Sequence, residues 1–537
     1  MTNIPSTVAI LVLFASPLAG TQRFYPDDPL IDEPPPLALD QPAFRKLNDY
    51  YDAFAHILGE PGERQPRGGE AIRALSVNTL DEVSNGAWFT NRIGSVPIGI
   101  DGIRRGPRQS NAPDPNGPWT IVGAKTQGVT PGFQIVDSGG ARYLLKFDPI
   151  EHPEMATAAD VIGSLIFHAL GYHVPENYLV SFDPAILVIG EGATIEGPGG
   201  EDRPISGADV NTALTRVARA SDGRVRAVAS YFLPGSPLGE FRYYGTRSDD
   251  FNDTVPHEHR RELRGLFVFA AWVNHNDSRS INTFDTLIVE DERRYIRHYL
   301  IDFGAILGSA SIYSNTARDG NAYFLEAREA LAQMLTLGAY VPWWARANYY
   351  KSDAVGMLMA DPLAPDDWKP NYPNPAFLNR LPDDTFWAAK KVMAFTDEHI
   401  RAIVEEGRYS NPEDERVVAD YLIARRDRIG QAYFDRVIPL DNFRVADSTL
   451  AFDDLAVVYG LRPRREYTVE WSEFDNETGA RTPIAASVAL PATLQGAEDG
   501  RYFLATIRDE MAPGQAVEVW LRTDSAGVSV VGVRRNW

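Results

Sequence analysis

Three oxygen-bearing side chains near the middle of this chain constrain its fold more than any other feature. Asp277 is followed five residues later by Asn282, and Asp302 then opens an Asp-Phe-Gly at the end of a short apolar run. Phosphoryl transfer needs one carboxylate that orients the attacking hydroxyl and two oxygen ligands that hold a divalent cation on phosphates. If these residues act together, the fold must bring them into one cleft.

The residues upstream predict a β-hairpin and a buried lysine. The run 120–122 and the run 133–136 are short and apolar, with the loop of Gly128 and Gly132 between them. Small residues in such a loop let backbone N–H groups approach an anion, although glycines alone also fit a plain tight loop. Lys146 stands inside the next apolar strand, where a buried ammonium group requires an anionic partner.

A helix follows the lysine strand and offers two acids. Apolar residues recur with helical spacing over 155–170, and Gly171 is typical of a helix C-cap. Asp160 lies in the second turn, whereas Glu154 lies at the start, where an acid is also favoured by the helix dipole. Either carboxylate can reach back to Lys146, so the residues alone leave both pairings open.

The helix over 257–273 carries one apolar stripe and is expected to be a buried central helix. It ends in Asn-His-Asn-Asp, so that four hydrogen-bonding side chains, Asp277 among them, meet at one loop. Such groups cost stability unless they have partners or a function. A polar turn that caps two elements, with Asp277 as a capping residue, is the alternative interpretation.

This ordered set resembles the catalytic centre of the protein-kinase-like superfamily over about residues 115–310. It resembles the atypical HipA-like and spore-coat CotH-like branches more than the eukaryotic protein kinases, since His-Arg-Asp and Ala-Pro-Glu are absent and Asn276 replaces the usual arginine. The stretches 146–149 and 171–178 also resemble a group of large bacterial proteins with export signals.

The resemblance implies a nucleotide site that binds ATP with Mg²⁺ or Mn²⁺. It assigns Lys146 to the α- and β-phosphates, with Gly128 and Gly132 in the loop above them. It favours Asp160 over Glu154 as the partner of the lysine. The remaining roles are Asp277 for orienting the acceptor hydroxyl, Arg279 for the transferring phosphate, and Asn282 and Asp302 for the metal.

Composition excludes several other classes of protein. The chain has 537 residues, which suggests three to four domains, and a formal net charge of −21, which argues against nucleic acid or an anionic membrane as a partner. It has no cysteine, so disulfides, thiolate zinc sites and cysteine nucleophiles are excluded.

The first twenty residues are expected to be a signal peptide. Residues 8–15 are apolar and residues 16–20 are mostly small, as in the core and cleavage region of a secretory signal. The prediction is therefore a periplasmic or extracellular protein, with a cytoplasmic one as the alternative. No later segment has the roughly twenty apolar residues that a transmembrane helix needs.

The predicted fold class is α+β, with a bilobal protein-kinase-like core between two further parts. An irregular extension is expected to pack on the small lobe, and alternating strands near the C-terminus predict a small β-sandwich-like domain. The segments are a signal peptide over 1–20, the extension over 21–118, the small lobe over 119–237, the helical large lobe over 238–440 and the β-domain over 441–537.

Two functions of different class are compatible with these patterns. The first is a phosphotransferase that moves the γ-phosphoryl group of ATP to a hydroxyl of a protein, a glycan or a small molecule. The second is an exported, catalytically silent kinase-like domain that acts as a binding or scaffold protein. The polar set around Asp277 favours the first, and export favours the second because ATP is scarce outside the cytoplasm.

Overall fold

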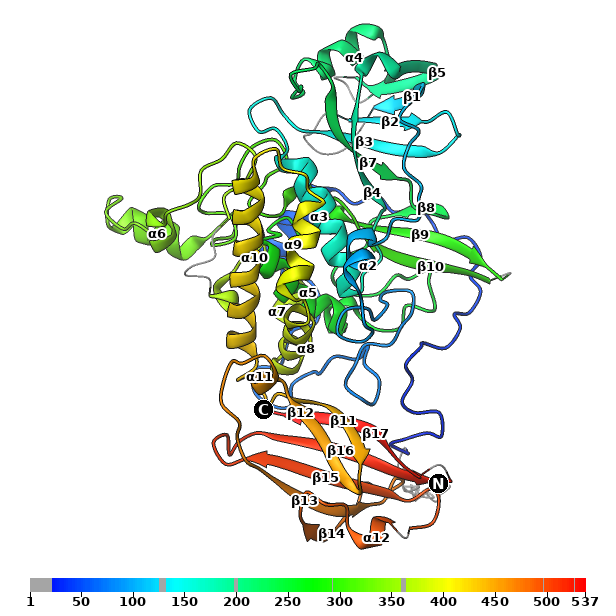
Figure 1. The fold of residues 1–537 in the computed structure, drawn as a ribbon, viewed down its shortest axis with the longest axis vertical. Helices are drawn as coiled ribbons and strands as arrows, with labels where there is room; N and C mark the ends of the chain where they lie inside the picture. Colours follow the sequence, from blue (N-terminus) through cyan, green and yellow to red (C-terminus); the bar gives the residue numbers. More distant parts are fainter. Residues whose placement is uncertain are drawn as a thin grey trace, which may run out of the picture.

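The protein has a mixed α+β fold with three parts along its long axis (Figure 1). The computed structural model describes residues 22–124, 132–197, 201–291, 293–358, 364–495, 497–525 and 527–537. The expected signal peptide and the loop residue Gly128 lie outside these ranges. A mixed sheet forms the top of Figure 1, helices form the middle, and the C-terminal sheets form the bottom.

The top part is a seven-stranded sheet of order β4-β7-β3-β2-β1-β5-β6. Its central strands are antiparallel, while β1 pairs with β5 in parallel. The turn 137–140 joins β2 to β3, as the Asp-Ser-Gly-Gly sequence predicts. The strands are β1 (Trp119–Ala124), β2 (Gly132–Val136), β3 (Arg142–Phe147), β4 (Asn177–Phe182), β5 (Leu187–Glu196), β6 (Asp202–Pro204) and β7 (Val225–Tyr231).

Helix α3 (Met155–Leu170) joins this sheet to the helical part. It contacts β4 and β7 on one side and α9 (Asp397–Glu405) on the other, so all its residues except His168 are buried. A helix that is covered all round needs no polar face, and this explains its run of small and apolar residues. Gly171 ends it with a φ of 130° that an L-residue rarely adopts.

The middle part is built around helix α5 (Arg261–Val273), in which every residue is buried. It packs on α7 (Pro375–Leu378), α8 (Pro382–Met393) and α10 (Pro412–Tyr433). The helix expected from His257 begins later, because residues 257–259 form a 3₁₀ turn. The other helices are α1 (Asp49–Phe54), α2 (Ile100–Arg105), α4 (Gly207–Leu214), α6 (Ala327–Leu335), α11 (Leu455–Val458) and α12 (Ala492–Gln495).

Strands β8 (Ser236–Gly239), β9 (Thr283–Glu290) and β10 (Arg293–Leu300) form a three-stranded sheet beside these helices. In the antiparallel pair of β9 and β10, Thr283 stands opposite Leu300. The Ile301 N–H donates to the Asn282 carbonyl at 3.0 Å, which extends the pairing by one step. Asn282 and Asp302 therefore leave the same end of the ladder.

The C-terminal part consists of antiparallel sheets, as expected. A five-stranded sheet of order β14-β13-β15-β16-β17 faces the pair β11–β12. Leu440 and Leu450 of the pair share one buried cluster with Val469, Trp471 and Val519 of the larger sheet. The strands are β11 (Leu440–Ala446), β12 (Thr449–Asp454), β13 (Tyr467–Phe474), β14 (Arg481–Ala486), β15 (Tyr502–Asp509), β16 (Ala516–Asp524) and β17 (Gly527–Asn536).

The N-terminal extension packs on residues 119–237 over part of its length, for example where the Thr90 N–H donates to the Gly171 carbonyl at 2.9 Å, and other stretches of it pack elsewhere. Phe24 packs on Trp520 of the C-terminal sheet, Leu39 joins the core of the three-stranded sheet, and Trp88 and Phe89 enter the helical core. The part after α2 reaches the top sheet, for example where the Asn111 N–H donates to the Tyr178 hydroxyl. A segment without a core of its own buries its apolar side chains in several others.

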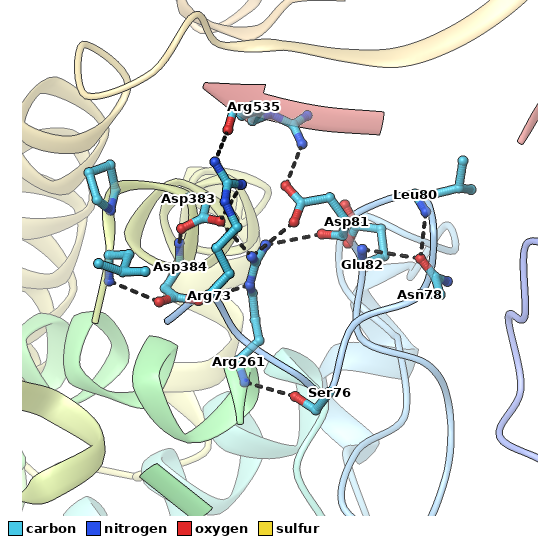
Figure 2. Close-up of polar contacts among 12 residues, drawn as sticks. Arg73, Ser76, Asn78, Leu80, Asp81, Glu82, Arg261, Asp383, Asp384 and Arg535 are labelled. Carbon is cyan, nitrogen blue, oxygen red and sulfur yellow. Dashed lines mark hydrogen bonds and ion pairs between the residues drawn. The ribbon is translucent and has the colours of Figure 1, made fainter. Parts of the chain in front are cut away.

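A buried ionic cluster joins the extension, helices α5 and α8, and strand β17 (Figure 2). The guanidinium group of Arg261 on α5 contacts Asp81 of the extension at 2.9 Å and both Asp383 and Asp384 of α8 at 3.0 and 2.9 Å. Arg535 of β17 contacts Asp81 from the opposite side at 3.1 Å. All five side chains are buried, so each charge depends on its neighbours.

We expect Arg261→Leu to lower the free energy of unfolding by about 3–5 kcal/mol, because it removes the cation that Asp81, Asp383 and Asp384 share, and these carboxylates are buried. Urea denaturation monitored by tryptophan fluorescence measures the loss. Arg416→Leu is the matched control, since the Arg416 pairs with Glu413 and Asp420 lie at the surface and their removal is expected to have no measurable effect. Equal midpoints for the two variants would contradict the role of the cluster.

Candidate active site

Lys146 lies between two carboxylates that come from distant parts of the chain. Its ammonium group contacts the carboxylate of Asp160 on α3 and donates to Asp302 Oδ1 at 3.1 Å. Asp160 also accepts from the Asn177 side chain at 3.0 Å. Glu154 is not the partner: it precedes α3 with a φ of 71° and accepts from the Ser410 N–H at 2.8 Å. Of the two acids left open by the sequence, the structure brings only Asp160 to the lysine.

Two carboxylates set the charge state of Lys146. Burial by itself would lower the pKa of Lys146, but Asp160 and Asp302 outweigh that effect and raise it. Burial raises the pKa of Asp160, and Lys146 opposes this rise. Lys146 therefore stays charged between the two carboxylates. The Asp302 side chain is 34% exposed and that of Asp160 only 3%, so Asp302 is the carboxylate that an incoming cation can reach.

The loop after α5 gathers side chains around Asp277. Asn274 ends the helix in the left-handed conformation, with a φ of 54°. The Asn282 amide donates to the Asp277 carboxylate at 2.9 Å and to the Asp277 carbonyl at 2.7 Å. Arg279 contacts the same carboxylate, and the Asn371 amide donates to it at 3.0 Å. Asp277 and Asn282, which are five residues apart in the sequence, are thus in direct contact.

These contacts bear on the alternative in which Asp277 only caps an element. Within the described ranges, its carboxylate accepts from side chains and from no backbone N–H group. A capping carboxylate would bind backbone N–H groups at a helix start. The arrangement therefore differs from a capping turn.

Packing of the Asp-Phe-Gly segment directs Asp302 toward Lys146. The Phe303 ring stacks on Phe167 of α3 at 4.9 Å, and the Phe303 N–H donates to Asp160 at 3.1 Å. Gly163 makes this approach possible, because a Cβ atom there would lie 2.4 Å from the Cβ of Phe303. Asp302 itself has a φ of 59°, which turns the chain sharply at the end of the strand.

The residues present fit a divalent cation in part. Asn282 and Asp302 offer hard oxygen atoms of the kind that Mg²⁺ prefers, at the same end of the β9–β10 ladder. Among the described residues there is no group of three or more acidic, histidine or cysteine side chains that could hold a metal. A cation bound here would need phosphate oxygens and water to complete its ligands, as in nucleotide sites.

Two residues of this site were not found from the sequence. Asn371 lies far along the chain and binds both Asp277 and the Asn276 side chain. Asp49 of α1 accepts from Arg279 at 2.6 Å, so the extension reaches the site. Arg279 is therefore held between Asp277 and Asp49, and no local pattern in the sequence indicates either long-range contact.

The described part of the glycine loop is small. Gly132 begins β2 and stands directly opposite Lys146 in the pairing of β2 and β3. Gly128 belongs to the segment that the structure does not describe, so its predicted place above phosphates stays a prediction.

Comparisons with known proteins add little. No family model and no curated protein matches the chain. Six solved chains match. One is the crystal structure of the Golgi casein kinase with Mn/ADP bound, at 10% identity and a TM-score of 0.30, covering 59% of this chain and 72% of that chain. Another structure of the Golgi casein kinase has 9% identity and a TM-score of 0.31, covering 63% of this chain and 77% of that chain. These scores are too low to assign a fold or an activity here.

The structure yields a test of the lysine pairing. We expect Lys146→Met to lower the free energy of unfolding at neutral pH by about 3 kcal/mol, the low end for a broken buried pair, because Asp302 keeps some contact with water. The deficit should shrink as the pH falls, since Asp160, whose pKa is raised in the folded state, then takes up a proton.

Urea denaturation at pH 7 and pH 5 measures both effects. Glu154→Gln is the control, because Glu154 does not contact Lys146 and keeps an oxygen for the Ser410 N–H when it is replaced. If the loss of unfolding free energy in Lys146→Met is the same at pH 7 and pH 5, the broken ion pair with Asp160 is not its cause.

Proposed function

We propose that this protein is an ATP-dependent phosphotransferase of the protein-kinase-like type, which acts with Mg²⁺ or Mn²⁺ on a hydroxyl acceptor. One observation carries the proposal: the β9–β10 ladder joins two pairs of side chains, Lys146 with Asp302 at 3.1 Å and Asn282 with Asp277 at 2.9 Å. A structural turn has no need of all four groups.

Each residue has a role that its surroundings support. Lys146, held by Asp160, would neutralise the α- and β-phosphates of the nucleotide. Asn282 and Asp302 would hold the metal ion, which supplies positive charge to the bridging phosphate oxygens when bound. Asp277 would orient the acceptor hydroxyl and accept its proton as the γ-phosphoryl group moves to the hydroxyl oxygen and ADP leaves.

The contacts of Arg279 set a condition on this mechanism. In the structure its guanidinium group is shared by Asp277 and Asp49. These carboxylates raise the pKa of Arg279 against the opposing effect of burial, so it stays charged. A transferring phosphoryl group would have to compete with Asp49 for that charge, whereas the Asp277 contact keeps the arginine beside the reacting atoms.

One observation favours the second candidate, a silent kinase-like binding protein. The Asp277 carboxylate already has three side-chain partners, so little of its hydrogen-bonding capacity remains for an acceptor hydroxyl. Export, which residues 8–15 predict, would also separate the protein from cytoplasmic ATP. This candidate predicts nucleotide binding without turnover, or no binding at all.

We expect ATP with Mg²⁺ to stabilise the protein. Ligand at 100 times its Kd contributes about 2.7 kcal/mol to the free energy of unfolding, and the shift should vanish when EDTA removes the metal. Differential scanning fluorimetry measures it. Lys146→Met should lose the shift relative to its own unliganded midpoint. No shift at millimolar nucleotide with any divalent ion would rule out the enzyme.

Substitutions at the two aspartates should act differently. Asp277→Asn should leave ATP affinity nearly intact and lower turnover by roughly 10²- to 10⁴-fold, since that carboxylate serves the acceptor. Asp302→Ala should weaken metal-nucleotide binding, because it removes a metal ligand. Calorimetry and release of ADP measure the two properties. Equal weakening of binding by both substitutions would show that the roles are wrong.

A further inference from the structure

A pocket separate from the candidate active site lies between the end of α8, the extension and the C-terminal sheets. Figure 1 shows these elements below the top sheet. Its volume is about 680 Å³, within the usual range for small-molecule sites. Much of its wall is apolar, with contributions from Ile93, Val445, Leu455, Tyr459, Val528 and Val530. Two adjacent lysines of α8, Lys390 and Lys391, also line it.

The two lysines differ in their partners. Lys390 contacts the carboxylates of Glu82 and Asp441 directly. The ammonium group of Lys391 donates to the Asn91 side-chain oxygen at 3.0 Å and lies 5.4 Å from the centroids of the Phe89 and Trp387 rings. Within the ranges that the structure describes, no carboxylate pairs with Lys391.

A buried ammonium group without a carboxylate partner is costly. Lys391 is only 2% exposed, and one neutral hydrogen bond uses one of its three donors. Burial lowers the pKa of Lys391 to about 8; Lys390 adds to this and Glu82 and Asp441 oppose it. The cost would be offset by a ligand that brings a negative charge into the pocket.

The other charges around the pocket are already paired. Asp441 contacts both Lys390 and Arg535, and Arg444 contacts Asp453. Glu82 is held by Lys390. Among the described residues that line the pocket, Lys391 is therefore a buried cation in contact with no carboxylate, and a single negative charge would pair with it.

We propose that this pocket binds a small organic monoanion, with the carboxylate of the ligand on Lys391 and its apolar body along the walls from β11, α11 and β17. The volume, the apolar lining and the buried ammonium group that contacts no carboxylate together define that class of ligand. The site is independent of the nucleotide chemistry proposed above, because it shares none of those residues.

The test uses 4-phenylbutyrate as the probe and 4-phenylbutanol as its neutral analogue. Calorimetry on the full chain at pH 7 should show saturable binding of the acid at least tenfold tighter than that of the alcohol. Lys391→Met should abolish this preference, while its unliganded melting temperature stays equal to or above that of the wild type, because an apolar side chain replaces a buried charge. Lys351→Met, at an exposed position, is the control and should bind normally.

The pH dependence is a second measurement that needs no variant. The ammonium form of Lys391 binds the anion, so affinity should fall about tenfold from pH 7 to pH 9. Equal affinity for acid and alcohol, unchanged binding in Lys391→Met, or no binding of either probe would overturn the proposal. A large fall in melting temperature of Lys391→Met would show instead that Lys391 serves the fold.

Discussion

Helix α5 is the element on which the rest of this structure depends, because it is buried on every side and polar at both ends. At its start, Arg261 and Arg264 must find carboxylates inside the protein, and Asp383 and Asp384 of α8 supply them. A helix so anchored cannot shift without leaving charges unpaired. The loop that follows it, with Asp277 at its end, is placed by this anchoring.

The same principle acts at Lys146, where one ammonium group joins the top sheet, α3 and the end of β10. There Asp302 is the more exposed of the two carboxylates. Within the described ranges, the partly exposed carboxylate of Asp302 and the buried ammonium group of Lys391, which contacts no carboxylate, each point to a ligand.

The extension links these places in a way that its composition does not show. It supplies Asp81 to the ionic cluster, Asp49 to Arg279 and Asn91 to Lys391. An irregular segment can follow the surface of several parts and place single side chains in each, since it has no regular hydrogen bonding to preserve. Removing it would therefore affect the candidate site and the C-terminal sheets together.

The sequence by itself determined the local elements and the order of the polar residues. The turn 137–140, the apolar stripe of α5 and the order of Lys146, Asp277 and Asp302 are all local patterns of spacing. They predicted an α+β fold with β-strands at the C-terminus, because periodicity reports which face of an element is buried.

The tertiary structure decided which of these residues meet. Spacing left Asp160 and Glu154 equally able to reach the lysine strand, and the packing of α3 against the sheet selected Asp160. Asn371 and Asp49 reach Asp277 and Arg279 from segments far along the chain, for which no local signal exists. Contacts between distant segments depend on how whole elements pack, and a pattern confined to one element carries no information about its neighbours in space.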